Sequence, residues 1–110
     1  MNIKNEKAGN FIVLKIKGRI DTVNSSALER EVNQLFESGE KNLIFNCSEM
    51  DYISSSGLRV FLVAQKKAIS INGKLYLSNM QPAIQEIFRI SGFSNLFKIF
   101  GSQEEVLEAQ

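Results

Sequence analysis

The sequence predicts a single domain of the α/β class, with a mixed, largely parallel sheet of four to five strands covered by helices. Short apolar runs alternate with segments of helical spacing along the chain. The 110 residues suffice for one core. No internal repeat, low-complexity tract or linker divides them. Residues 1–110 are therefore expected to form one domain.

The chain is expected to begin with an antiparallel hairpin. Residues 3–7 alternate weakly between apolar and polar side chains, and residues 8–10 read Ala-Gly-Asn, which is typical of a turn. Residues 11–17 then form a strong strand pattern. The side chains expected on one face of that strand are Ile12, Leu14 and Ile16.

A loop and the first helix are expected after the hairpin. Residues 18–24 are read as a connecting loop. The helix is predicted to begin near Ser26, because Ser26 to Glu29 fit the pattern of a capping box, and to end at Gly39. Its apolar stripe consists of Leu28, Val32, Leu35 and Phe36.

The middle of the chain predicts two more strands around a second helix. Residues 43–47 form an apolar run interrupted only by Asn46, which suits a central strand buried on both faces. After a loop over residues 48–54, helical spacing runs from about Ser56 to Ile71, and residues 74–77 form the next strand.

The last part of the chain predicts two further helices and a short strand. Pro82 suits the first turn of a helix that Gly92 ends. Residues 96–100 are a short apolar segment, read as an edge strand. Residues 102–105 form a second capping box, which predicts a final short helix.

This order of elements also predicts where functional loops gather. Strands that alternate with helices imply right-handed crossovers and parallel pairing, with functional loops beyond the carboxyl ends of the strands. That rule brings together three loops, at residues 18–24, 48–56 and 78–82.

Composition argues against several classes of function. The chain has no histidine, which removes the commonest general base and metal ligand, and it has no paired cysteines and no phosphate-binding loop. We therefore expect no metal and no cofactor. The single cysteine, Cys47, lies in an apolar run and is expected to be a small buried side chain in a reducing compartment.

Charge and hydropathy point to a cytoplasmic protein. The net charge is +1, with 13 basic and 12 acidic residues interspersed, so nucleic-acid binding is not expected. No apolar run approaches the roughly 20 residues of a membrane-spanning helix, and the first residues lack the apolar centre of a signal peptide. Membrane insertion is not expected either.

The most informative stretch is the cluster from Ser54 to Gly57, which lies between a strand and a helix. The first N–H groups of a helix lack internal partners, and the helix dipole is positive there. A serine at this place can cap the helix, and a phosphoserine would bring its charge close to free N–H groups. That chemistry suits a switch better than a catalyst.

Three segments resemble the STAS domain of bacterial anti-sigma-factor antagonists, and together they span nearly the whole chain. Residues 18–21, Gly-Arg-Ile-Asp, are similar to the family's Gly-x-x-Asp after the second strand. Residues 52–58, Tyr-Ile-Ser-Ser-Ser-Gly-Leu, resemble its phosphorylation motif, commonly Asp-Ser-Ser/Thr/Ala-Gly-Leu after an aromatic–apolar pair. Residues 90–93 and 96–99 resemble its carboxyl-terminal signature.

The resemblance implies a phosphorylation-controlled switch and not an enzyme. Unphosphorylated, such a protein binds an anti-sigma factor, which is itself a serine kinase, and releases the sigma factor; a serine phosphatase restores this form. The family's phosphorylated serine falls on Ser55, with Ser54 at the position of the family's Asp, and Ser54 and Ser56 remain alternative acceptors. The expected partner-binding residues are Asp21, Thr22, Asn24, Ser54, Ser55, Ser56, Gly57 and Arg59.

Other interpretations stay open at this point. The serines could serve only as helix caps, and Asp21 only as a turn residue. The same fold could also be a STAS subunit of a lipid-transport complex or of a stress-signalling scaffold. A small serine hydrolase is disfavoured, because the chain lacks histidine and a Gly-x-Ser-x-Gly elbow.

Overall fold

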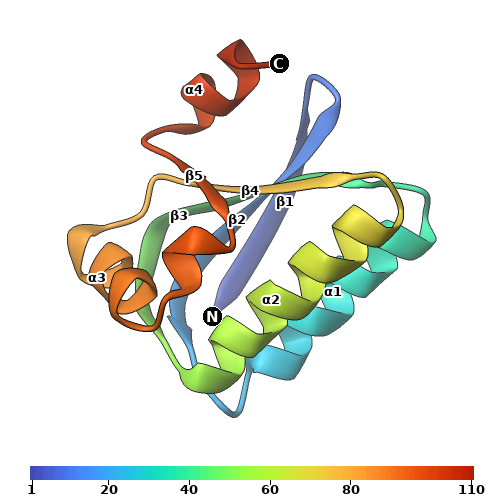
Figure 1. Ribbon diagram of the computed structural model, residues 1–110. Coiled ribbons are helices and arrows are strands. Elements are labelled where there is room, and N and C mark those ends of the chain that lie inside the picture. The colour runs from blue at the N-terminus through green and yellow to red at the C-terminus, as the bar shows by residue number, and fades with distance from the viewer.

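A five-stranded sheet forms the centre of the computed structural model, which describes all residues 1–110 (Figure 1). The strand order follows the sequence. β1 pairs with β2 antiparallel, and every later neighbouring pair is parallel, so the predicted mixed, largely parallel sheet is confirmed. The strands are β1 (Asn2–Ala8), β2 (Phe11–Ile20), β3 (Asn42–Ile53), β4 (Lys74–Ser78) and β5 (Lys98–Phe100).

Four helices and one short 3₁₀ turn, η1, accompany the sheet. In Figure 1, α1 and α2 run side by side across one face, α3 follows along the same layer, and α4 lies apart near the C-terminus. None of these helices is long and apolar enough to cross a membrane. Their bounds are α1 (Ser25–Glu37), α2 (Ser55–Ser70), α3 (Pro82–Ile90), η1 (Phe93–Asn95) and α4 (Gln103–Glu108).

The main core lies between the sheet and helices α1, α2 and α3. Successive side chains of a strand point to opposite faces, so Leu43 and Phe45 of β3 enter this core while Ile44 enters a second cluster beneath α4. The prediction that this strand is buried on both faces is confirmed. Phe61 of α2 packs edge-on against Phe45, with ring centroids 4.8 Å apart. Burial of such side chains is the main favourable term in folding.

In the structure, the first residues of two predicted loops belong to strands. β2 continues through Gly18 to Ile20, and β3 continues through residues 48–53. The apolar alternation fails there because register irregularities, between Lys15 and Lys17 and after Gly18, shift which side chains face inward. The predicted ends of both strands, read from the sequence pattern, are therefore too early.

The predicted start of α1 near Ser26 lies within one residue of the observed start, but the predicted capping box is wrong. The helix begins at Ser25 with Asn24 as N-cap, and Asn24 makes no side-chain cap hydrogen bond. Ser26 is exposed and forms no capping box, because it is the second residue of the helix and not its N-cap. The Ser25 N–H donates to the Asp21 carbonyl at 3.0 Å. α2 begins at Ser55, one residue before the prediction, whereas the predicted last helix is confirmed with Ser102 as its cap.

Cys47 is fully buried in the main core, which confirms its predicted role as a small buried side chain. Burial raises the pKa of its thiol to about 12. At pH 8 the reactive thiolate is therefore almost absent. We expect iodoacetamide to label Cys47 only after the protein is unfolded in urea, as followed by mass spectrometry. Labelling of the folded protein at the rate of a free cysteine would contradict the observed packing.

Candidate partner-binding site

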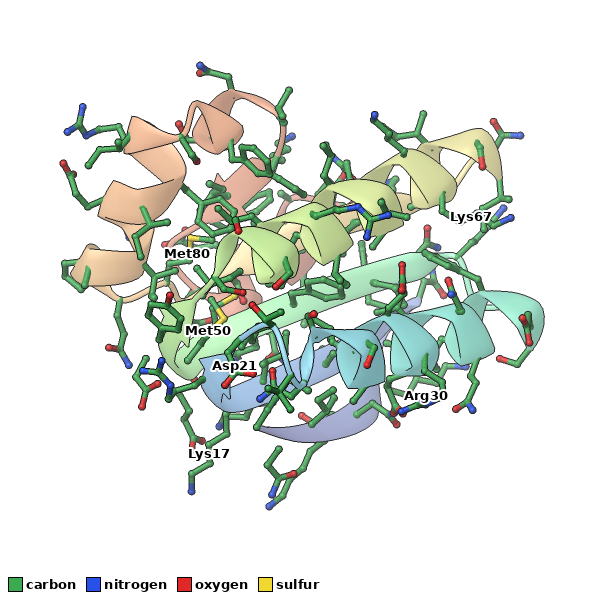
Figure 2. The ribbon with its side chains drawn as sticks, turned by 90° about the horizontal axis from the view of Figure 1, so that it is seen from below. Lys17, Asp21, Arg30, Met50, Lys67 and Met80 are labelled. Atoms are coloured by element: carbon green, nitrogen blue, oxygen red, sulfur yellow. The ribbon has the colours of Figure 1, made fainter.

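The serine cluster lies where β2 and β3 end and α1 and α2 begin. β2 and β3 stay paired up to Ile20 and Ile53, and the Ser54 N–H then donates to the Ile20 carbonyl at 2.8 Å. Figure 2 shows Asp21 at this end of the sheet, in the connection that leads into α1. The β2–α1 and β3–α2 connections therefore form one continuous surface.

A reciprocal set of hydrogen bonds fixes the β2–α1 connection. The Asp21 side chain accepts from the backbone N–H groups of Val23 and Asn24, each at 3.0 Å. In return the Asn24 side chain accepts from the Asp21 N–H at 2.8 Å and donates to the Arg19 carbonyl at 2.9 Å. These contacts make Asp21 and Asn24 the residues that shape the loop, which agrees with the turn role considered for Asp21.

The three serines of the cluster differ in what their hydroxyls do. Ser54 is the N-cap of α2, and its hydroxyl accepts from the Gly57 N–H at 3.1 Å. Ser54 and Ser56 hydroxyls lie 2.9 Å apart, and Ser56 also reaches Thr22 at 3.5 Å. Ser55, the first residue of α2, is exposed and its hydroxyl makes no hydrogen bond within the chain.

Gly57 allows α2 to start directly against the sheet. A Cβ at this position would lie 2.7 Å from Ile20 Cγ2 and 2.8 Å from Ile53 Cγ1. Both distances are shorter than real Cβ contacts, and both isoleucines are buried. The absence of a side chain at Gly57 thus sets how closely the serine cluster approaches the ends of β2 and β3.

Ser54→Ala is expected to lower the free energy of unfolding by about 1 kcal/mol, because α2 loses its cap. Ser55→Ala is the matched control, with an expected change close to zero, since that hydroxyl has no partner. Urea denaturation of both variants measures the difference. Equal stability of the two variants would show that the Ser54 cap does not stabilise the helix.

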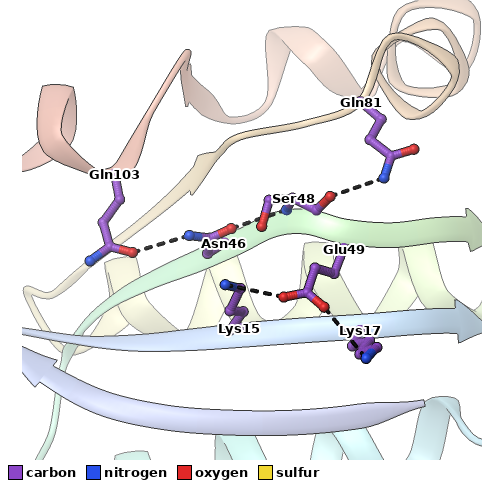
Figure 3. Close-up of polar contacts among 7 residues, drawn as sticks. All are labelled: Lys15, Lys17, Asn46, Ser48, Glu49, Gln81 and Gln103. Atoms are coloured by element: carbon purple, nitrogen blue, oxygen red, sulfur yellow. Dashed lines mark hydrogen bonds and ion pairs between the residues drawn. The ribbon is translucent and has the colours of Figure 1, made fainter.

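The third predicted loop lies away from the serine cluster. β3 and β4 pair only as far as Asn46 and Ser78, whereas β3 runs on to Ile53, about 23 Å further at roughly 3.3 Å per residue. Gln81, which follows β4, donates instead to the Ser48 carbonyl at 2.9 Å (Figure 3). The third loop therefore meets the second at Ser48, whereas only the first two loops come together at the serine cluster.

Two exposed features beside the cluster were missed from the sequence. Val23 is 88% exposed, at the tip of the fixed β2–α1 connection. Arg19 lies over the Tyr52 ring, 4.2 Å from its centroid, and makes no ion pair. A lone apolar residue in a polar loop was the available signal for Val23. The Arg19–Tyr52 contact depends on strand register, which the sequence pattern did not define.

Arg59 stands one helical turn after Ser55 and is also exposed. It makes no ion pair within the chain. Residues four apart on a helix are surface neighbours. An anion at position 55 and the guanidinium of Arg59 would therefore share one face of α2.

The fold and this site together define a STAS domain. The STAS domain profile matches residues 2–106, nearly the whole chain. The chain therefore belongs to the STAS domain family, as its motifs predicted.

A relative and two solved structures extend this result. A protein of Bordetella bronchiseptica, provisionally named anti-sigma factor antagonist BtrV, is 31% identical over 109 residues, which are 99% of this chain and 94% of the relative. An anti-sigma factor antagonist from Mycobacterium paratuberculosis has a similar structure, with a TM-score of 0.88, 20% identity, and coverage of 98% of this chain and 92% of that one. The Bacillus cell fate determinant SpoIIAA in its phosphorylated form matches with a TM-score of 0.76 and 18% identity, covering 98% of each chain. At these identities the two structures support the fold alone.

Proposed function

We propose that this protein is an anti-sigma factor antagonist that works as a phosphorylation-controlled partner switch and catalyses no reaction. The unphosphorylated form binds an anti-sigma serine kinase in the cytoplasm and makes it release its sigma factor. Phosphorylation breaks this binding, and a serine phosphatase restores it. Family membership and the name of the Bordetella relative support this proposal.

The observation that carries the proposal is the difference between the three hydroxyls. Ser54 and Ser56 are partly buried and held in hydrogen bonds, whereas Ser55 is exposed and unpaired. A kinase needs a free hydroxyl that can enter its active site. Ser55 meets this requirement without unfolding any part of α2.

The switch follows from where the new charge would lie. A phosphate on Ser55 adds about −1.5 to −2 charge at pH 7, at the first residue of a helix. The positive end of the helix dipole favours an anion there, so the fold tolerates the change. A partner surface fitted to a neutral hydroxyl would instead have to accept a buried, unpaired charge.

Arg59 gives the phosphorylated state a further contact. An anion followed four residues later by a cation is the favourable orientation on a helix. In the unmodified protein Arg59 is free to meet the partner. After phosphorylation it would pair with the phosphate, so the interface would gain an anion and lose a cation.

Arg59→Ala is expected to raise the second pKa of a phosphate on Ser55, because a cation that favours the dianion is removed. The expected rise is about 0.3 unit, the equivalent of roughly 0.4 kcal/mol. Phosphorus NMR titration of the two phosphorylated proteins measures it. Lys66→Ala removes a cation further along α2 and serves as the control, with a smaller expected shift. Identical titration of the Arg59→Ala and parent proteins would rule out the pairing.

Phosphosite mapping after reaction with the cognate kinase and ATP tests the proposed function. We expect phosphate on Ser55 and none on Ser54 or Ser56. Modification of Ser54 or Ser56 alone would show that the phosphorylated serine is not Ser55. If no serine of the cluster is modified, the switch hypothesis is rejected in favour of the alternative, a STAS subunit in a larger assembly.

A further inference from the structure

The sheet has a second exposed surface, on the face opposite α1 and α2. α4 covers only part of this face, where Val106 packs on Phe11, Val13 and Ile44. Further along β2 the outward side chains are charged and exposed, and Figure 3 shows Lys15, Glu49 and Lys17 on this open part of the sheet. We define the basic face as Lys4 of β1 with Lys15, Lys17 and Arg19 of β2.

The arrangement of the basic face does not serve stability. Lys4 and Lys15 are direct cross-strand partners in the β1–β2 register. Like charges placed opposite each other destabilise a sheet, and an acidic residue at position 4 would remove the conflict. Two lysines at paired positions therefore conflict with local stability, and such conflicts are typical of functional surfaces.

One carboxylate of the chain itself is already bound by lysines of the basic face. Glu49 of β3 lies 3.1 Å from Lys15 Nζ and 3.7 Å from Lys17 Nζ. The hydrogen bond from Lys15, followed by the charges of Lys15, Lys17 and Lys4, lowers the pKa of Glu49. The hollow between these side chains, lined by Asn2, Lys4, Lys15, Lys17 and Glu49, has a volume of about 180 Å³.

The two ends of the basic face have no such partner. Neither Lys4 nor Arg19 lies within ion-pair distance of a carboxylate. The Arg19 guanidinium carbon lies 4.2 Å from the Tyr52 ring centroid, and its N–H donors make no ion pair within the chain. Lys15 and Arg19 are four residues apart on β2, about 13 Å at roughly 3.3 Å per residue.

We propose that the basic face is a second docking surface, which binds a carboxylate-rich segment of a partner protein independently of the Ser55 surface. Carboxylates from the partner would occupy the positions beside Lys4 and Arg19, as Glu49 does between Lys15 and Lys17. Charge complementarity favours such a segment over a nucleic acid, because the four cations, partly neutralised by Glu49, are fewer than the phosphate contacts that duplex binding commonly uses.

Hexaglutamate is the probe for this surface, added to the ¹⁵N-labelled full chain at low ionic strength. We expect NMR shift changes concentrated on the amides of β1 and β2 that carry the basic face, and loss of most of them in 0.5 M NaCl. The double variant Lys4→Glu/Arg19→Glu should bind the peptide at least tenfold more weakly. Lys66→Glu/Lys67→Glu makes the same change of charge on α2 and should weaken binding no more than twofold.

A measurement of stability distinguishes loss of the binding surface from damage to the fold. Lys4→Glu alone creates an opposite-charge pair with Lys15, so its urea midpoint should equal or exceed that of the parent protein while peptide binding falls. Equal weakening by the α2 variant, or shifts spread over all lysines, would overturn the proposal. Tighter binding of the basic face to oligothymidylate or to phosphatidylserine vesicles than to hexaglutamate would overturn the choice of a protein partner.

Discussion

Ser55→Asp is expected to weaken binding to the anti-sigma kinase by about 30-fold or more, while Ser55→Ala binds within about twofold of the parent protein. An unpaired carboxylate buried at an interface costs about 2 kcal/mol or more, and 1.4 kcal/mol is tenfold in Kd. Ser55 is exposed at the first position of α2, so the new charge would face the partner. Isothermal titration calorimetry with the cognate kinase measures both variants.

The stability of the same variants gives the control. Aspartate at the start of a helix interacts favourably with its dipole, so Ser55→Asp should unfold at an equal or slightly higher urea concentration than Ser55→Ala. A loss of binding with intact stability places the effect at the interface. Kinase affinities that agree within threefold for Ser55→Asp and Ser55→Ala would mean that position 55 lies outside it.

Gly57→Ala is expected to lower the free energy of unfolding by about 2 kcal/mol. Alanine in place of glycine within a helix normally gains about 1 kcal/mol, so the expected sign is the reverse of the usual one. The reason is the 2.7 Å and 2.8 Å approaches to Ile20 and Ile53, which overpack a buried junction. The start of α2 would also shift, and binding to the kinase should weaken with it.

Gly101→Ala is the matched control for this prediction. Its added Cβ would meet only the carboxylate end of Glu105, at 3.2 Å, and that flexible side chain can move. We expect a change below about 0.5 kcal/mol for this variant in the same urea denaturation. A Gly57→Ala protein as stable as the parent would show that the helix–sheet junction can expand without cost.

The element order and the sheet were predictable because they depend on apolar spacing. The alternation in residues 11–17 and the continuous run in residues 43–47 each defined a strand of the observed sheet. The ends of β2 and β3 were not predictable in this way. They are held by backbone hydrogen bonds across an irregular register, which carries polar side chains such as Glu49 to the exposed face.

The sequence motifs located the two loops of the candidate site but not the contacts between them. The serine motif located the start of α2, and Gly-x-x-Asp located the neighbouring loop. Which serine caps the helix, and which hydroxyl remains free, depends on the placement of Ser54 opposite Ile20 and on the contact of Ser56 with Thr22. These contacts join segments more than thirty residues apart in sequence, so local pattern does not define them.

Release of the sigma factor tests the central claim most directly. The cognate anti-sigma kinase is loaded with fluorescently labelled sigma factor, and fluorescence anisotropy is followed as this protein is added. The unphosphorylated protein should free the sigma factor, whereas the same protein phosphorylated on Ser55 should leave the complex intact at equal concentration. Equal release by both forms, or release by neither, would contradict the proposal that Ser55 controls a partner switch.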